Sequence, residues 1–370
     1  MKKYTQKGIL WIFTIAILVL MQMSVFAEDT SNPAEEQIQY TVTKEKGTRH
    51  ILPGEDTFIT YNIPSDAVLT SSDTKVIQVA NSGLMHAKKS GTATVTMTSD
   101  LNKTKYVVKV QVIEEVDLII FAGQSNMCGS GGSKALAPTP ASGTAYEFDV
   151  ATKAKKCLPM KEPFGQGANR KQGFDDTKVY STSGTLASAF CIAYYKQTKT
   201  PVVGVPAAWG GSSTNTWLNR GLVKETQSRV KLAKKYLKKK GIKIRHIYML
   251  WYQGESDGMK GLSEEQYKTN MKGIYRKMKT VGVENIMVIR IGKDANAPWN
   301  GEEIMKAQEN LCKSDKHFTL VSTKAKTFYD KYRYYYADTI HMNQIALNQI
   351  GTEAGNNAGK YAKKHSKKTK

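Results

Sequence analysis

From Val116 onward, short apolar runs alternate with amphipathic stretches of helical spacing, and this alternation restricts the possible folds most strongly. Runs of four to eight apolar residues bounded by turn-forming residues are typical of strands buried on both faces. Strands that alternate with amphipathic helices predict a doubly wound α/β sheet covered by helices on both sides. The runs predicted to form parallel strands are Leu118–Ala122, Val202–Ala207, His246–Tyr252, Ile286–Ile291 and Phe318–Val321.

Two of the intervening stretches show a clear helical face. Ser263 with Gln266 forms a capping-box pattern before one of them, and Gly282 marks its end. Gly241 stops the other, which carries lysines around its polar side. The apolar positions are Tyr267, Met271, Ile274 and Met278 in the first helix, and Val223, Val230, Ala233 and Leu237 in the second.

Residues 38–113 have a different period. In Thr92–Thr98, Ala, Val and Met alternate strictly with threonine, and glycine, proline and asparagine turns recur between the runs. Alternation with period two and regular turns predicts an antiparallel sandwich with one buried face and one solvated face. The segments Leu69–Val79 and Ser82–Ala93 resemble the bacterial immunoglobulin-like domain, group 2. Such modules serve as spacers or adhesive units, and no catalytic constellation lies in this region.

The first 27 residues are typical of a cleaved signal peptide. A basic start precedes the apolar run Ile9–Met21, and Val25–Ala27 suits cleavage before Glu28. The apolar run is shorter than the roughly 20 residues of a membrane span, so no stable span is expected. The predicted organisation is a signal peptide at 1–27, a linker at 28–37, the immunoglobulin-like domain at 38–115, the α/β domain at 116–360 and a basic tail at 361–370.

The chain of 370 residues is strongly basic, with a formal net charge of +22. Removal of residues 1–27 takes away three lysines and no acidic residue, which leaves +19. An exported chain without a zinc finger, RNA-binding signature or helix-turn-helix pattern is not expected to bind nucleic acid. The charge leaves two interpretations open, a solvated basic surface or attraction to an anionic cell-wall or glycan surface.

The four cysteines indicate neither a metal site nor a disulfide framework. None of them lies in a Cys-x-x-Cys pair, which argues against a zinc site. Export permits disulfides, but the spacing does not determine any pairing. Cys191 falls in a helical apolar stretch and is expected to be a buried thiol. The cysteines are Cys128, Cys157, Cys191 and Cys312.

Polar or glycine-rich blocks directly follow three of the predicted strands. Ser125 follows the first, Gly210 and Gly211 follow the second, and Gln253 follows the third. In doubly wound sheets the site lies beyond the carboxyl ends of the strands, so these blocks should meet at one edge. A serine hydroxyl needs a base to become a nucleophile, and backbone N–H groups after it can face the developing oxyanion.

The base is expected from the far end of the chain. His341 is preceded by Asp338 at a spacing that allows the carboxylate to turn back and accept from Nδ1–H. This contact fixes the tautomer and stabilises the imidazolium, as in a Ser-His-Asp triad. Glu255 is the alternative carboxylate, or it holds its loop together with Asp257. A helix is expected to open at Met342.

Four blocks carry a resemblance to a known family. They resemble the SGNH/GDSL hydrolase superfamily, and more narrowly the sialate O-acetylesterase-like and acetylxylan esterase-like members grouped as carbohydrate esterase family six. The match covers about 116–360, and Gly-Gln-Ser in place of Gly-Asp-Ser is in keeping with the narrower group. The blocks are Phe121–Met127, Gly210–Ser213 with Trp217, Trp251–Asp257 and Asp338–His341.

The resemblance implies a flavodoxin-like three-layer α/β/α fold and a catalytic triad of Ser125, His341 and Asp338. It also implies oxyanion contacts from the N–H groups of Ser125 and Gly211 and from the side chain of Gln253. Gln253 stands where the wider superfamily has asparagine. Supporting positions are Glu255, Gly210 and Asn126.

These features predict a secreted serine esterase that removes O-acetyl groups from carbohydrates through an acyl-serine intermediate. No metal or organic cofactor is needed for this reaction. Sialoglycan, xylan, peptidoglycan and other acetylated sugars remain open as substrates. The alternatives are a surface carbohydrate-binding protein with an inert hydrolase fold, and a lipid or short-chain ester hydrolase. Two roles are equally open for the aromatic residues near these blocks, a platform that binds sugar rings or packing in the core. These residues are Trp209, Trp217 and the cluster Phe328, Tyr329, Tyr332 and Tyr334–Tyr336.

Overall fold

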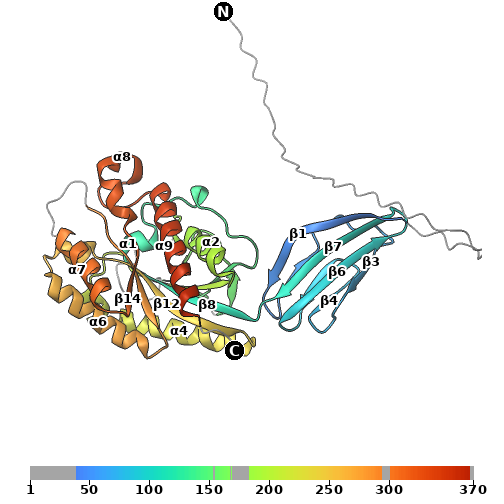
Figure 1. The fold of residues 1–370 in the computed structure, drawn as a ribbon, viewed down its shortest axis with the longest axis horizontal. Coiled ribbons are helices and arrows are strands. Elements are labelled where there is room, and N and C mark those ends of the chain that lie inside the picture. Colours follow the sequence, from blue (N-terminus) through green and yellow to red (C-terminus); the bar gives the residue numbers. More distant parts are fainter. Residues whose placement is uncertain (1–38, 153–154, 167, 169–182, 294–300, 367–370) are drawn as a thin grey trace, which may run out of the picture. The chain divides into compact units, whose positions relative to one another are not determined.

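The structure, a computed structural model, describes residues 39–152, 155–166, 168, 183–293 and 301–366 (Figure 1). The predicted signal peptide and linker lie outside the described residues. No helix in the described ranges is both long enough and apolar enough to cross a membrane. None of the four cysteines forms a disulfide, and Cys191 is fully buried, as predicted.

The N-terminal β region consists of two sheets that share one apolar core. One sheet has the strand order β1-β7-β6-β3 and the other β2-β5-β4. Ala93, Val95 and Met97 of β6 are buried while the intervening threonines are partly exposed, as the alternation predicted. The strands are β1 (Thr41–Ile51), β2 (Asp56–Phe58), β3 (Val68–Ser71), β4 (Ile77–Val79), β5 (Leu84–Ala87), β6 (Gly91–Ser99) and β7 (Thr104–Val112).

The prediction of purely antiparallel pairing is wrong at one edge of this region. Strand β1 pairs with β7 in parallel, whereas β6 pairs antiparallel with both β7 and β3. Alternation of side chains reports only which face of a strand is buried, so it does not distinguish the two directions of pairing.

The region from Glu115 onward contains a seven-stranded sheet with the order β10-β9-β11-β8-β12-β13-β14. All its pairings are parallel except that of β10 with β9. The five predicted parallel strands are all present, and their order corresponds to the doubly wound order 2-1-3-4-5. These five are β8 (Glu115–Gly123), β11 (Val202–Ala208), β12 (Lys243–Tyr252), β13 (Asn285–Ile289) and β14 (Phe318–Ser322).

The edge strands β9 (Ala145–Phe148) and β10 (Cys157–Pro159) were not predicted. They are only four and three residues long, and β10 is largely exposed. Such short segments lack the continuous apolar run that marks the central strands. By contrast, β8 is buried from Val116 to Gly123, as expected for a parallel strand covered on both faces.

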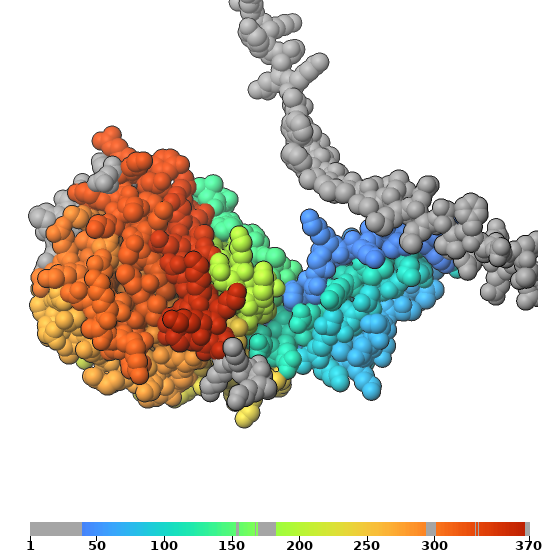
Figure 2. Space-filling view, viewed as in Figure 1, coloured from blue at the N-terminus to red at the C-terminus, as the bar shows by residue number. Residues whose placement is uncertain are grey.

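Helices cover both faces of the sheet. The pair α2 and α9 packs together over β9, β11, β13 and β14, and α4 contacts β11, β12 and α6 (Figure 1). In the space-filling view, α9 (red) lies beside α2 (yellow-green) (Figure 2). The longer helices are α2 (Ala187–Thr198), α4 (Leu222–Lys239), α6 (Glu264–Lys279), α7 (Gly301–Ser314) and α9 (Gln344–His365).

Local signals set several helix ends. The Ser263 side chain caps α6 by accepting from Gln266 N–H, but the Gln266 side chain bonds Asn270, so only half of the predicted capping box forms. Helix α9 begins at Gln344 rather than at Met342, because Asn343 is its N-cap and accepts from Ala346 N–H. The short helices are α1 (Ser125–Cys128), α3 (Thr214–Asn219), α5 (Glu255–Met259) and α8 (Tyr332–Tyr335), with 3-10 turns at Lys134–Leu136 and Lys324–Lys331.

Candidate active site

Three strand ends lie side by side at the carboxyl edge of the sheet. Gly123 pairs with Ala208 of β11 and with Tyr252 of β12. Its φ is +147°, and a Cβ atom there would lie 2.0 Å from the carbonyl oxygen of Tyr252. Only glycine allows this approach. The register brings the residues after β8, β11 and β12 to one edge, as the sequence predicted.

Ser125 is the first residue of α1, two residues beyond β8. It is buried, with 6% of its surface exposed. Helix α1 ends after one turn, at Gly129 in the left-handed region with φ +83°. The serine therefore lies at a sharp strand-to-helix turn beyond the end of β8.

His341 and Asp338 form a compact local pair. Nδ1 of His341 lies 2.7 Å from Oδ2 of Asp338. The other carboxylate oxygen accepts from the N–H groups of Ile340, at 2.8 Å, and of His341, at 2.7 Å. Partial burial raises the pKa of Asp338, but the hydrogen bonds from His341 and Ile340 outweigh it and hold this pKa below its ordinary value.

Asn126 connects the turn that carries Ser125 (the serine turn) to the loop that carries Asp338 and His341 (the histidine loop). Its Nδ2 donates to the carbonyl oxygen of Ile340, at 3.2 Å, and its Oδ1 accepts from Met342 N–H, at 2.9 Å. These two residues flank His341 on either side. The side chain next to Ser125 thus holds the backbone on both sides of the histidine.

Glu255 does not bond Nδ1 of His341, because that nitrogen is bonded to Asp338. Its Oε1 instead accepts from Asn126 Nδ2, at 2.7 Å. The side chain is buried, and burial raises the pKa of the Glu255 carboxyl in spite of the hydrogen bond from Asn126. Of the two carboxylates considered as partner of His341, the geometry favours Asp338.

Gly210 and Gly211 form a turn directly after β11. Gly210 N–H faces the sulfur of Cys128, while Gly211 has φ +67° and open space where a Cβ would lie. Within the described part of the chain, the N–H groups of Ser125 and Gly211 have no acceptor. An oxyanion site requires unpartnered N–H groups, and these two follow the neighbouring strands β8 and β11 at the same edge of the sheet.

Gln253 is fully buried, and its amide hydrogens are directed into the protein. Nε2 contacts Gln124 Oε1, at 3.2 Å, the Ser212 carbonyl oxygen, at 3.1 Å, and the carboxylate of Asp257. An oxyanion contact from Gln253 would have to share a hydrogen with one of these acceptors. The geometry gives Gln253 a further task that the sequence did not suggest, which is to join the loops that follow β8, β11 and β12.

The sequence did not indicate several residues that hold these loops together. Asp257, which was considered only as a loop residue, also accepts from the N–H and hydroxyl of Thr214. Asn270 of α6 donates to the Thr214 hydroxyl, at 2.9 Å. Gln124 Oε1 accepts from Ser256 N–H as well as from Gln253. Gln124 and Asp257 lie inside the quoted motifs, but Thr214 and Asn270 carry no local signal.

The aromatic residues divide into packed and exposed members. Trp209 and Trp217 are buried and pack edge to face, so they contribute to the core. Phe328 and Tyr336 are buried, whereas Tyr329 and Tyr334 are exposed. Tyr335 is half-buried, so Tyr329, Tyr334 and part of Tyr335 have surface to offer a ligand. The side chain of Tyr332 lies outside the described atoms.

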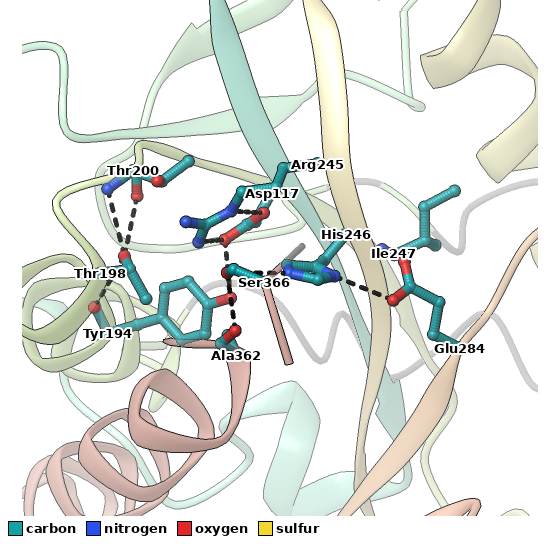
Figure 3. Close-up of polar contacts among 10 residues, drawn as sticks. All are labelled: Asp117, Tyr194, Thr198, Thr200, Arg245, His246, Ile247, Glu284, Ala362 and Ser366. Atoms are coloured by element: carbon teal, nitrogen blue, oxygen red, sulfur yellow. Dashed lines mark hydrogen bonds and ion pairs between the residues drawn. The ribbon is translucent and has the colours of Figure 1, made fainter. Parts of the chain in front are cut away.

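A second serine, histidine and carboxylate arrangement lies at the amino ends of the strands (Figure 3). His246 of β12 contacts Glu284 through Nδ1, at 2.9 Å, and Ser366 through Nε2, at 3.3 Å. The Ser366 hydroxyl, however, donates to the Ala362 carbonyl oxygen, at 2.8 Å. Beside it, the buried Asp117 is paired with Arg245 (Figure 3). The contacts of Ser366 hold the end of α9, and its hydroxyl hydrogen is engaged by the Ala362 carbonyl oxygen and not by His246.

The fold is a doubly wound α/β sheet, with Ser125 just beyond the end of β8 and the bonded His341–Asp338 pair in a loop that Asn126, the residue after Ser125, contacts. Residues 115–359, about two thirds of the chain, match the family described as carbohydrate esterase, sialic acid-specific acetylesterase. The chain belongs to this family. It is therefore a hydrolase that acts on esters, of the carbohydrate esterase type. In the described residues, no group of three or more His, Cys, Asp or Glu side chains is placed to hold a metal ion.

Solved structures similar to the chain include a protein from Arabidopsis thaliana with 20% identity, which covers 68% of this chain and 100% of that chain with a TM-score of 0.48. A carbohydrate acetylesterase from Xanthomonas citri has 13% identity, with 86% and 73% coverage and a TM-score of 0.40. An acetylxylan esterase from Geobacillus stearothermophilus has 9% identity, with 65% and 93% coverage and a TM-score of 0.38. Among curated protein sequences, none matches the chain significantly.

Proposed function

We propose that the protein is an exported serine esterase that removes O-acetyl groups from carbohydrates, with Ser125, His341 and Asp338 as its catalytic residues. The observation that carries the proposal is the bonded His341–Asp338 pair, whose loop is held to the serine turn by Asn126. The family supports a carbohydrate ester as the substrate class.

In the proposed reaction, the Ser125 hydroxyl oxygen attacks the acetyl carbonyl carbon while His341 takes its proton. Asp338 holds the Nδ1–H of the imidazole and stabilises the imidazolium. The oxyanion is bound by the N–H groups of Ser125 and Gly211, with Gln253 holding the surrounding loops. The carbon–oxygen bond to the sugar then breaks, and the sugar oxygen takes the proton from His341. Water, deprotonated by His341, attacks the acetyl-serine, and acetate leaves as Ser125 regains its proton.

The test is acetate release by the chain 28–370 from acetylated xylan and from an O-acetylated sialoglycan. Ser125→Ala is expected to abolish release from the preferred polymer. Ser366→Ala is the matched control, because Ser366 belongs to the second serine–histidine–carboxylate arrangement and should leave kcat unchanged. Equal release by wild type and Ser125→Ala, or loss only in Ser366→Ala, would overturn the assignment.

The two alternatives from the sequence are separated by the same preparation. A lipid hydrolase would prefer longer acyl chains in a series of p-nitrophenyl esters, whereas the proposed acetylesterase should lose activity as the acyl group lengthens. A short-chain ester hydrolase would cleave p-nitrophenyl acetate but release no acetate from either polymer. An inert hydrolase fold would release no acid from any ester while retaining binding to a carbohydrate.

We also propose that residues 1–27 direct export and that the region 38–115 is an immunoglobulin-like spacer or binding module. The basic start and apolar run support export. The two sheets around one core support a module with its own hydrophobic interior. Expression in a secreting bacterial host should yield a protein whose first residue is Glu28. An intact Met1 on the exported protein would contradict the cleavage.

An anionic polysaccharide is the partner that the surface charge favours. Helices α4 and α6 are neighbours, and the groove of about 600 Å³ that they help to line contains three lysines and no acidic residue. We refer to the exposed lysine and arginine side chains of α4 and α6 as the α4–α6 basic face. They are Lys224, Lys231, Lys235, Lys238, Lys239, Lys272, Arg276, Lys277 and Lys279.

Binding of polygalacturonate, with neutral dextran as the control polymer, tests this partner. Glutamine at Lys224, Lys231, Lys235 and Lys277 should lower the salt concentration at which the protein elutes from the immobilised polymer. The matched variant carries four glutamines in the β region, at Lys44, Lys46, Lys88 and Lys89. An equal effect of both variants would show that binding follows net charge and not the α4–α6 basic face.

A further inference from the structure

The side chain of Asn126 joins three segments that are far apart in the sequence. It lies directly after Ser125 at the end of β8, and it bonds Glu255 beyond β12 and the backbone of Ile340 and Met342 before α9. The side chain is buried, with 2% of the residue's surface exposed. In a buried site these hydrogen bonds are not exchanged with water, so they constrain position strongly.

The three contacts permit only one orientation of the Asn126 amide. The NH₂ group faces two acceptors, Glu255 Oε1 and the Ile340 carbonyl oxygen, while the amide oxygen faces the Met342 N–H. A rotated amide would place oxygen against oxygen and nitrogen against N–H. This position therefore requires a side chain with a donor at one end and an acceptor at the other, and a side chain of the same shape without both could not make these bonds.

Glu255 makes the contact that most strongly determines which end of the Asn126 amide faces which neighbour. One of its oxygens accepts from Asn126, and the other has no hydrogen-bond partner among the described residues. Burial of a carboxylate oxygen without a hydrogen-bond partner costs free energy. The bond of Glu255 to Asn126 turns the NH₂ group toward the Ile340 carbonyl oxygen and leaves the amide oxygen for Met342.

We propose that Asn126 is a positioning residue that sets His341 against Ser125, and that Glu255 fixes the direction of its amide. This inference rests on the proposed function, because it assigns the histidine and serine their catalytic roles. A loss of the tether displaces His341 without removing any group that touches the substrate. Misplacement of a catalytic group by about 1 Å costs on the order of a hundredfold in rate.

Three variants with p-nitrophenyl acetate test the positioning role. Asn126→Asp places a carboxylate against Glu255 and Ile340 and should lower kcat about a hundredfold, with KM within about threefold of wild type. Glu255→Gln should cost less, because its amide oxygen still accepts from Asn126. The double variant Asn126→Asp/Glu255→Gln should recover at least about tenfold over Asn126→Asp, since the new amide donates to the new carboxylate.

A matched control separates positioning from general loss of stability. Asn285 is also a buried asparagine, and it donates to the Lys316 carbonyl oxygen and to the Tyr361 hydroxyl. Asn285→Asp should lower the melting temperature while kcat stays at the wild-type value. A kcat for Asn126→Asp equal to that of wild type, or a double variant no better than Asn126→Asp, would overturn the inference.

Hydrogen exchange gives a readout that does not depend on activity. Met342 N–H is bonded to Asn126 Oδ1, so Asn126→Ala should speed its exchange at least about tenfold, with that of the α9 core unchanged. Unchanged exchange would overturn the tether itself. Faster exchange together with a wild type no more active than Ser125→Ala would show that the tether exists and that the proposed function is wrong.

Discussion

Both carboxylate oxygens of Asp338 are engaged within the histidine loop. One accepts from two backbone N–H groups and the other holds the imidazole of His341. An ionised acceptor is needed for this set of contacts, and the hydrogen bonds keep the pKa of Asp338 below its ordinary value. Since a lowered pKa keeps the carboxylate charged, the stability it contributes is present above the ordinary pKa of 3.8 and is lost as the pH falls through the lowered value.

Asp338→Asn should lower kcat by about 10³–10⁴-fold while KM changes little. The amide cannot accept from Nδ1–H and from both backbone N–H groups, so the imidazole takes the wrong tautomer. Steady-state kinetics on p-nitrophenyl acetate at pH 7 measures the effect, with circular dichroism to confirm folding. If Asp338→Asn lost less than tenfold, Asp338 would not be the essential partner of His341.

At the scale of the elements, α9 meets α2 through glycine. Gly351, Gly355 and Gly359 are spaced four residues apart, so they form one ridge along the helix. A Cβ at Gly355 would lie 2.3 Å from the Phe190 carbonyl oxygen, and one at Gly351 would lie 2.5 Å from that of Leu186. The two helices therefore pack backbone to backbone, and this packing holds the helix that follows His341.

Gly355→Ala should destabilise the protein by about 1–3 kcal/mol, because the added methyl group forces the two helices apart. Gly273→Ala in α6 is the matched control, since a Cβ there would meet Leu218 at an ordinary 3.4 Å. This substitution should stabilise the protein by about 0.5–1 kcal/mol, the usual gain of alanine over glycine inside a helix. Urea unfolding of both variants measures the difference, and shifts of the same sign would contradict the packing argument.

At the scale of the whole molecule, buried acids set how stability depends on pH. Burial raises the pKa of Glu147 on β9 to about 8, and the charges of Glu162 and Asp149 add to this effect, although Gly165 N–H opposes it. The folded protein thus keeps a proton that the unfolded chain releases near its ordinary value of 4.5. Because the native state binds more protons across this window, stability falls as the pH rises through it.

Glu147→Gln removes this pH dependence. The melting temperature of the variant relative to wild type should rise between pH 4.5 and pH 8 and level off above that, because only the wild type has to bury a charge. A difference of at least about 2–4 °C is expected, the shift that about 1 kcal/mol produces in a domain of this size. A constant difference across the range would show that Glu147 is ionised in the folded state throughout.

The carboxyl edge shows what could be anticipated from the sequence. Ser125, Gly211 and Gln253 were placed at one edge because each follows a run with the length and apolarity of a central strand, and the register confirms that these ends are level. The edge strands β9 and β10 and the parallel pairing of β1 escaped prediction. Strands β9 and β10 are too short to show a period. The period of β1 shows which face is buried but carries no information on the direction of pairing.

The sequence by itself determined the features whose cause is local. Strand and helix periods, the cap at Ser263 and the Asp338–His341 pair all depend on residues within a few positions of one another, where chain geometry leaves few choices. Only the tertiary structure decided the direction of the Asn126 and Gln253 amides. Their partners lie 41 to 216 residues away, apart from the neighbouring Asp257, and burial makes their hydrogen bonds obligatory only once those segments have packed together.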